Sequence, residues 1–325
     1  MVRYWQEKNG RLESVKKDEI DKKARLWVDA RNVTQEEIAA LESDFSLDPE
    51  LLLDVLDPDE LSRIEEWDDC ALSIMRLPVF NPGADVCYTT APLGAAVFSD
   101  KIITVCWTDC EVLRDIAANR IKGLTLNDFP AFVIRTLARA DAMFLRYLKE
   151  INRRTISIQD ELHESIENAE LLQLLNIEKS LTYFTTSLKS NQLLLEKIRR
   201  TKILKLDIED KEWLDDVEID NRQAMEMAAT YSQITSGIMD AVSSLISNNM
   251  NVIMKKLTVI SLVMMVISFI TSFWGMNIRL PWSGEDSWSG FFAIIAICAL
   301  SATASYLLLN LDSKTKNGFL RRKRK

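Results

Sequence analysis

The feature that most constrains the fold is an uncharged run of 18 residues near the C-terminus, Leu257 to Trp274. At about 1.5 Å per residue, a helix of this length nearly crosses the roughly 30 Å hydrocarbon core of a bilayer. A second uncharged run of 21 residues covers Phe291 to Leu311. Because only 16 residues separate the runs, the sequence predicts two antiparallel membrane helices. Neither is a signal peptide, since both follow a long polar chain.

The formal charge of −8 is distributed unevenly along the chain. From residue 251 onward, ten Lys and Arg against three Asp and Glu give +7, which leaves −15 for the first 250 residues. Basic residues flank the inner ends of both runs: Lys255 and Lys256 precede the first, and a basic tail at 312–325 follows the second. By the positive-inside rule both termini are cytoplasmic, and the loop 278–290 is external.

These features predict a multi-pass protein of a cell (inner) membrane, with membrane lipid as one partner. The basic tail could also be a nuclear address or a nucleic-acid-binding segment. Its position beside a membrane run favours contact with anionic lipid headgroups instead, so we expect no nucleic-acid partner.

Catalytic chemistry has little support in the sequence. The five cysteines form no paired framework, so we expect reduced thiols that act as small apolar side chains. Cys106 and Cys110 have metal-ligand spacing, but the single histidine, His163, lies far along the chain and makes a zinc site improbable. With no Gly-rich phosphate loop and no Ser/His/Asp set, the sequence does not predict an enzyme.

Residues 1–126 have the pattern of a mixed α/β domain. A Lys-Asn-Gly-Arg centre at Lys8 to Arg11 predicts a hairpin. Thr34 followed by Glu37 is a capping box that opens a helix. Further strands are expected at Ala24–Ala30, Cys70–Val79, Gly94–Phe98 and Lys101–Trp107, and a further short helix at Leu47–Leu53.

The period changes to 3.6 over 127–206, which predicts two long antiparallel helices broken near residues 166–169. Their apolar stripes are Val133, Leu137, Ala140, Phe144 and Leu148 on the first helix, and Leu171, Leu174, Leu175 and Ile177 on the second. A third helix has no breaker before Gly275, and it comprises a stalk at 207–256 and a first membrane span at 257–277. At roughly 95 Å for residues 211–274, it needs partners to pack on, most economically copies of itself.

A polar stripe runs along the membrane end of that helix at spacings of three and four. Its members are Asn251, Met254, Leu257, Thr258, Ser261, Met265, Ser268 and Ser272. One interpretation is helix–helix packing through small and polar residues. The other is a pore lining, in which Ser and Asn contact water while Met and Leu form hydrophobic constrictions.

Gly275-Met276-Asn277 follows the stripe directly. The glycine frees the backbone from helical geometry, and Asn277 offers an amide oxygen. Rings of such oxygens from several chains can hold a hydrated cation, which suits Mg²⁺ because it releases its waters reluctantly. Softer metals favour His or Cys, which the stripe lacks. Taken alone, the triplet is also consistent with a simple helix cap and turn.

In this setting the sequence resembles the CorA family of magnesium transporters. The resemblance rests on the paired C-terminal membrane helices, Gly275-Met276-Asn277, the basic tail and the run from Asn251 to Thr258. It extends weakly to Trp27-Val-Asp-Ala-Arg with Glu36-Glu37, and to Asp57-Pro-Asp-Glu60.

The resemblance implies an α+β cytoplasmic head with a long stalk helix and two C-terminal transmembrane helices, in a pentameric funnel. It implies a selectivity ring at Gly275, Met276 and Asn277, with Asn277 the metal-contacting residue, and a gate at Met254 and Leu257. The other implied pore-lining residues are Asn251, Thr258, Ser261, Met265 and Ser268. It also implies regulatory Mg²⁺ carboxylates between neighbouring heads, which match Asp216 and Asp240.

Three positions depart from the family pattern. Trp274 stands where Tyr is usual, Val266 stands where a proline is usual, and Asn81 falls where the carboxylate opposite Asp216 is expected. The last departure puts the Mg²⁺-sensing pair in doubt. In the external loop, Glu285 and Asp286 can either concentrate cations by attraction or be simply solvated.

The predicted function is downhill transport of Mg²⁺, with Co²⁺ and Ni²⁺ as further cargo, through a homo-oligomeric and pentameric pore. Mg²⁺ is expected as both cargo and cytoplasmic regulator. One alternative is a Zn²⁺ or other divalent-cation transporter of the same architecture. A second alternative is a membrane-anchored coiled-coil scaffold, which requires neither Asn277 nor the polar stripe.

Overall fold

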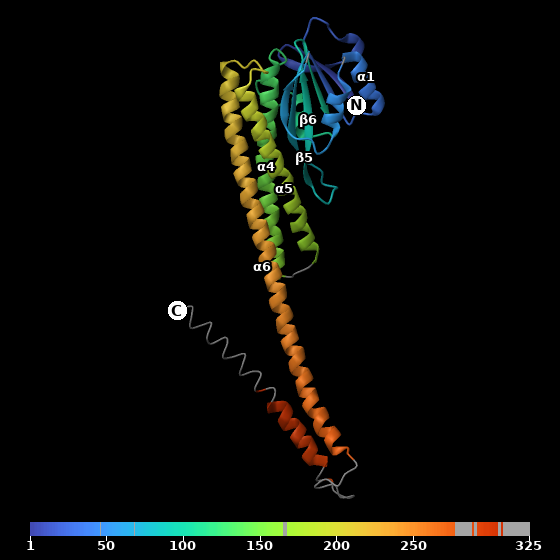
Figure 1. Ribbon diagram of the computed structural model, residues 1–325, viewed down its shortest axis with the longest axis vertical. Coiled ribbons are helices and arrows are strands. Elements are labelled where there is room, and N and C mark those ends of the chain that lie inside the picture. The colour runs from blue at the N-terminus through green and yellow to red at the C-terminus, as the bar shows by residue number, and fades with distance from the viewer. Residues whose placement is uncertain are drawn as a thin grey trace. The chain divides into compact units, whose positions relative to one another are not determined.

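The computed structural model describes residues 1–45, 47–67, 69–164, 168–276, Trp288, 291–304 and Leu307 (Figure 1). The chain divides into two compact units, Met1–Asp240 and Ala241–Lys325. The α/β segment 1–126 and the helical pair 127–206, predicted as separate domains, both lie in the first unit.

A seven-stranded sheet forms the centre of the first unit, in the order β2-β1-β3-β7-β6-β5-β4. The strands are β1 (Val2–Lys8), β2 (Arg11–Val15), β3 (Leu26–Arg31), β4 (Arg63–Glu66), β5 (Ala71–Phe80), β6 (Tyr88–Val97) and β7 (Lys101–Cys106). Only β3 and β7 pair in parallel, and every other pair is antiparallel. The predicted hairpin is confirmed as β1–β2. Asn9 and Gly10 in its turn have φ values of 53° and 73°, as a two-residue primed turn requires.

Helices α1 (Gln35–Phe45) and α2 (Pro49–Leu56) cover one face of the sheet. The predicted capping box is confirmed, because Glu37 N donates to Thr34 Oγ1 at 3.3 Å and Thr34 N donates to Glu37 Oε2 at 3.0 Å. Residues of β3 alternate between the two faces: Val28 belongs to the core beneath these helices, whereas the Trp27 ring packs on Phe132 on the other side.

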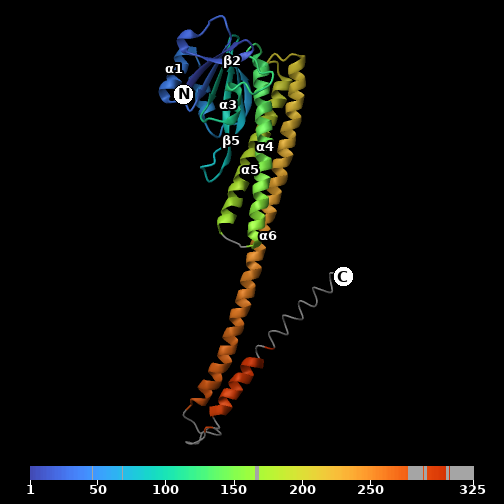
Figure 2. The same ribbon diagram turned by 180° about the vertical axis from the view of Figure 1, so that it is seen from behind.

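Two long helices, α4 (Phe129–Glu164) and α5 (Asn168–Arg200), lie side by side against the opposite face, as Figures 1 and 2 show. The predicted helical pair is therefore present, and residues 165–167 between the helices lie outside the described chain. The short η1 (Lys17–Glu19) and α3 (Glu111–Ala117) complete the part before α4. Helix α3, strand β4 and the first half of β6 were not predicted.

Helix α6 runs unbroken from Ile208 to Trp274, as predicted. Buried or half-buried side chains recur on it at alternating spacings of three and four, the heptad pattern of helices that pack lengthwise. These residues are Leu214, Val217, Asn221, Ala224, Ala228, Tyr231, Thr235, Ile238 and Val242. The same spacing appears on α4 (Asp141, Phe144, Leu148, Ile151, Thr155, Ile158 and Leu162) and on α5 (Leu174, Ile177, Leu181, Phe184, Leu188, Asn191, Leu195 and Ile198).

All five residues of the stripe predicted on α4 are buried. The stripe predicted on α5 was wrong at Leu175, which is 39% exposed, because the heptad passes from Leu174 to Ile177.

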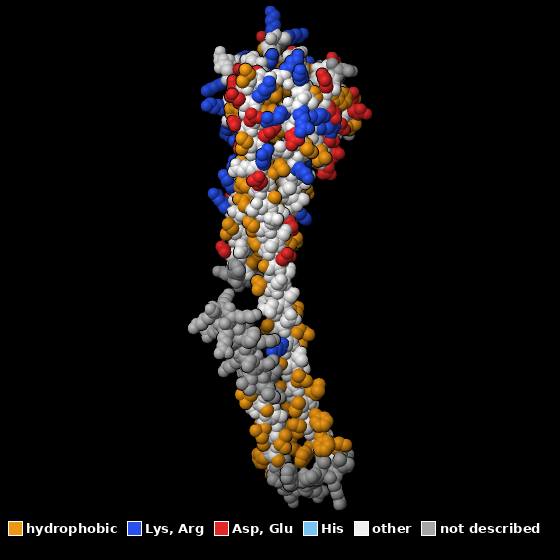
Figure 3. Space-filling view, turned by 60° about the vertical axis from the view of Figure 1, so that its left-hand side comes forward, with side chains coloured by type: hydrophobic (Ala, Val, Ile, Leu, Met, Phe, Trp, Pro, Cys, Tyr) orange, Lys and Arg blue, Asp and Glu red, His pale blue; other side chains and the backbone are white. Residues whose placement is uncertain are grey.

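The second unit contains the apolar end of α6 and a helix at Phe291–Ala304. Within the described chain, α6 is the single helix long and apolar enough to cross a membrane, with a mean hydropathy of 2.1 in its most apolar window. Hydrophobic side chains gather over this end of the molecule in Figure 3, while charged side chains concentrate on the first unit. The second predicted span, 291–311, is described as helix over 291–304, and most of its remainder lies outside the described chain.

Candidate ion pathway

The membrane end of α6 has two distinct faces. Five of its residues are half-buried: Val259, Val263, Ile267, Ile270 and Trp274. At about 100° per residue they occupy an arc of only about 80°. The helix 291–304 lies beside this part of α6 in both Figure 1 and Figure 2. Its own half-buried residues are Ala293, Ile294, Cys298, Ser301 and Ala302. These two stripes therefore form the contact between the helices.

The predicted pore residues lie on the opposite face of α6. The centre of that stripe is about 180° around the helix from the packed face. All its members are exposed: Asn251, Met254, Leu257, Thr258, Ser261, Met265, Ser268 and Ser272. The two hydrophobic gate candidates, Met254 and Leu257, are 52% and 56% exposed. The second helix therefore leaves the polar stripe uncovered.

Helix α6 ends as the sequence predicted, but Gly275 does not use the conformation unique to glycine. Its N–H still donates to Thr271 O at 3.0 Å. The glycines with positive φ in the described chain are Gly10 and Gly123. A Cβ at position 275 would also lie at an ordinary 3.4 Å from Thr271 O. The backbone thus leaves helical geometry after this main-chain hydrogen bond. No residue in the left-handed conformation is needed to end the helix.

The remaining filter and loop predictions fall outside the described chain. Asn277, Glu285 and Asp286 are among the residues whose placement is not described. The structure does describe Met276, which is 52% exposed just past the helix end. The roles assigned to these acidic and amide side chains therefore stay predictions.

The two predicted regulatory acids lie on the same helix and cannot meet within one chain. Asp216 and Asp240 are both exposed on α6, and their separation of 24 residues corresponds to about 36 Å along the axis. One ion therefore cannot bridge these two carboxylates within a single chain. Asn81, at the position that departs from the family pattern, accepts a hydrogen bond from Gly83 N at 3.1 Å, which is a turn-forming role.

A cluster of three carboxylates was not anticipated. Oxygen atoms of Asp128, Asp207 and Asp210 lie within 4.8 Å of one another. Asp207 and Asp210 form a reciprocal capping box at the start of α6, with N···O distances of 2.8 and 3.3 Å. Asp128 accepts from Ala131 N at the start of α4. Burial is the largest cause of the raised pKa of Asp210. Capping of two adjacent helix starts accounts for all three residues.

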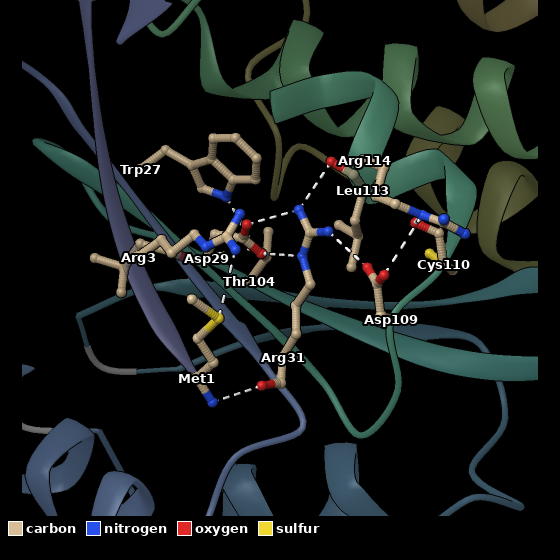
Figure 4. A network of polar contacts seen from close by, with 11 residues as sticks. Met1, Arg3, Trp27, Asp29, Arg31, Thr104, Asp109, Cys110, Leu113 and Arg114 are labelled. Atoms are coloured by element: carbon tan, nitrogen blue, oxygen red, sulfur yellow. Dashed lines mark hydrogen bonds and ion pairs between the residues drawn. The ribbon is translucent and has the colours of Figure 1, made fainter. Parts of the chain in front are cut away.

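The segment Trp27-Val-Asp-Ala-Arg, part of the family resemblance, supplies the polar network of Figure 4. Arg31 donates to both carboxylate oxygens of Asp29 (2.8 and 2.7 Å), to Asp109 (2.7 Å) and to Leu113 O (2.9 Å). Although these bonds favour the carboxylate, burial outweighs them and raises the pKa of Asp29. Four of the five guanidinium N–H groups are engaged in these bonds, so Arg31 fastens β3 to the loop before α3 and to α3 itself.

The five cysteines are free thiols, as predicted. Cys106 and Cys110 are buried free thiols. Cys106 Sγ donates to Pro92 O at 3.3 Å. Burial raises the pKa of both thiols, that of Cys110 to about 11. Buried thiols with a raised pKa are poor nucleophiles at neutral pH.

Comparison with known proteins decides the family. The family described as "CorA-like Mg2+ transporter protein" matches residues 22–316 of the 325. The chain belongs to this family. It is therefore a membrane transporter of divalent cations by family, and the alternative of a non-transporting scaffold is not favoured.

Individual relatives agree with this membership. The chain is similar to the "Cobalt/magnesium transport protein CorA" of Methanocaldococcus jannaschii, with 27% identity over 302 residues that cover 89% of this chain and 92% of the relative. It shares its fold with the complete structure of the CorA magnesium transporter from the same organism, at a TM-score of 0.78, with 23% identity and 95% and 96% of the two chains covered. A full-length CmaX protein gives a TM-score of 0.68 at 18% identity, with coverage of 95% and 96%.

Proposed function

We propose that this CorA-like protein is a homopentameric Mg²⁺ channel of a cell (inner) membrane. The observation that supports this best is the arrangement of the two faces of α6. Its apolar face is covered by the helix 291–304, and its stripe of Asn, Ser, Thr and Met stays uncovered. A ring of five copies can turn these uncovered stripes toward a shared axis, where polar side chains contact water.

The ring explains how Mg²⁺ passes without being stripped of its water. Five Asn277 amides at the outer end would present neutral oxygens to a hydrated ion, and Ser268 and Ser261 would continue that polar lining inward. Met254 and Leu257 would form apolar constrictions that close by excluding water. Inward movement needs no nucleotide, because a divalent ion gains about 4.6 kcal/mol per 100 mV of inside-negative potential.

We further propose regulation by cytoplasmic Mg²⁺ at two exposed acids of the stalk, Asp216 and Asp240. Asp216 and Asp240 lie too far apart to share an ion within one chain, so each would face a neighbouring copy. Such carboxylates repel when metal-free and are bridged when Mg²⁺ binds, so that occupancy favours a closed, symmetric ring. Both termini would be cytoplasmic, the basic tail would contact lipid headgroups, and Glu285 and Asp286 would attract cations outside.

The deciding experiment measures Mg²⁺ flux into proteoliposomes that contain a Mg²⁺-sensitive dye. Wild type and Asn277→Ala are compared with Asn249→Ala, a control that removes the same amide from an exposed α6 position outside the stripe. We expect flux in wild type and in the control, and its loss in Asn277→Ala. Equal flux in all three would place the filter elsewhere. No flux in any of them, with folded protein and low internal Mg²⁺, would refute the transporter assignment.

The polar stripe has its own test in a cysteine-free background. Ser268→Cys places a thiol on the uncovered face, and Ile270→Cys places one on the packed face. A charged thiol reagent should block flux through the first variant and leave the second unaffected. Block of the second alone would assign the pore to the other side of α6. Co²⁺, named with magnesium in the similar M. jannaschii protein, would be tested as a competitor of Mg²⁺ in the same assay.

A further inference from the structure

One pair of buried polar side chains interrupts the apolar stripes of α4 and α6. Asp141 on α4 and Asn221 on α6 both occupy heptad positions, and both are completely buried. They meet across the interface, where Asn221 Nδ2 donates to Asp141 Oδ1 at 3.1 Å. A polar pair at such positions costs stability but fixes the register in which two helices pack.

The other half of this pair lacks a partner. Asp141 Oδ2 and Asn221 Oδ1 are both buried, and neither has a hydrogen-bond donor within the described chain. Both atoms are acceptors when the carboxylate is ionised, so neither can satisfy the other. Leaving two buried acceptors unpaired, one of them charged, is strongly unfavourable.

A single proton on Asp141 Oδ2 would give both unpaired atoms a hydrogen-bond partner. We propose that Asp141 is held as a neutral carboxylic acid whose Oδ2–H donates to Asn221 Oδ1, so that two hydrogen bonds join α4 to α6 in a closed ring. The acid and the amide then each donate once and accept once. The α4–α6 contact becomes proton-dependent, because loss of that proton breaks one bond and buries a charge.

The surroundings of Asp141 favour the neutral form. Burial is the largest influence and raises the pKa of Asp141 well above its ordinary value, the Asn221 hydrogen bond lowers it, and the Asp220 charge on α6 raises it. The cation nearest in sequence on α4, Arg139, is engaged by Asp115 of α3. No group of α5 in the described chain contributes to the shift.

The expected pH dependence has a definite sign. An unfolded Asp releases its proton near pH 3.9, whereas the folded protein keeps it to a higher pH. Between these two values the folded state binds one more proton, so stability falls as pH rises, by up to tenfold in the unfolding constant per pH unit. Below the unfolded pKa the contribution is complete. Because α6 also carries the predicted pore residues, pH can reach transport through this contact, a consequence that rests on the proposed function.

Readouts that do not involve transport test the proton itself. Asp141→Asn replaces the acid by an amide of the same shape that donates and accepts in the same way, so it should fold at all pH values. Asp220→Asn is the matched control, since it removes a carboxylate one residue from Asn221. For the full-length protein in detergent, apparent unfolding midpoints are compared from about pH 5 to about pH 8.

We expect Asp141→Asn to gain stability over wild type progressively as pH rises. Asp220→Asn should keep the fall in stability of wild type, ending at a somewhat lower pH, because the Asp220 charge raises the pKa of Asp141. Infrared difference spectra should contain a protonated-carboxyl carbonyl band in wild type near neutral pH that is lost in Asp141→Asn and kept in Asp220→Asn. Parallel pH curves for wild type and Asp141→Asn, together with no band lost in that variant, would overturn the proposal. If Asp141→Asn fails to fold, a shift in frequency of the band in Asn221→Ala at neutral pH decides the question, because the acid there stays protonated but its O–H has lost its acceptor; an unshifted band would overturn the proposal.

Discussion

Gly94 allows a close approach between the sheet and helix α2. It lies in β6, opposite Ile74 of β5 and Val105 of β7. A Cβ added to it would lie 2.3 Å from Val55 Cγ2 and 2.7 Å from Cγ1. Val55 of α2 is completely buried, so neither atom can move into solvent. Gly94→Ala should therefore destabilise the first unit by about 1–3 kcal/mol, the usual cost of an extra methyl in a packed core.

A double-mutant cycle isolates this contact. Val55→Ala alone removes two buried methyl groups, at a cost of about 1.6 kcal/mol before any cavity effect. Combined with Gly94→Ala it also removes both clashing atoms, so the double variant should be more stable than the sum of the single changes by at least about 1 kcal/mol. The measurement is the denaturant midpoint followed by tryptophan fluorescence. Gly83→Ala is the control, because its Cβ would meet only Asn81 Oδ1 at 3.6 Å. Additive changes would refute the argument from close approach.

Three further outcomes are expected. Thr104→Val should lower stability by about 1–3 kcal/mol in the same denaturation assay, because it leaves the buried Trp27 indole N–H without the acceptor now 2.9 Å away; no change would mean that another acceptor takes its place. Thr34→Ala should cost about 1 kcal/mol by removing the cap of α1, and hydrogen exchange should accelerate in that helix alone. Cys110 should resist alkylation in the folded protein at neutral pH, since its pKa of about 11 leaves about one thiol in ten thousand ionised. Mass spectrometry of labelled peptides measures this, and labelling of Cys110 as fast as that of the half-buried Cys87 would refute the prediction.

Features determined by neighbouring residues could be predicted from the sequence. The β1–β2 hairpin follows from Asn9-Gly10, and the start of α1 follows from Thr34 and Glu37, because each depends on hydrogen bonds or dihedrals within a few positions. The two faces of the apolar end of α6 were also predictable in part. Spacing alone grouped the polar residues, although only the structure shows that the second helix covers the other side.

The missed elements depend on distant partners. Strand β4 is Arg-Ile-Glu-Glu, in which only Ile64 is buried, so its pairing with β5 leaves almost no apolar signal. The first half of β6 contains Pro92, which argues against a central strand. The β6–β7 pairing begins at Leu93, so β6 lacks a β7 partner at Pro92 and the missing N–H is tolerated there.

The pairing of Asp141 with Asn221 was beyond local reasoning for a similar reason. The residues are 80 positions apart, and their contact depends on the register of two packed helices. The filter residue Asn277, in contrast, was singled out by its triplet and its place after the stripe. It stays a prediction because it lies outside the described chain.

The N-terminal hairpin has a practical consequence for how this protein is expressed. The family match begins at residue 22, so a truncation guided by it would discard both β1 and β2. Strand β3 pairs with β1 on one side and β7 on the other. Without β1 it would become an edge strand with unpaired backbone groups flanked by buried Leu26, Trp27 and Val28. Such an edge is a template for intermolecular pairing, so the shortened protein should aggregate although it retains every residue by which its family is recognised.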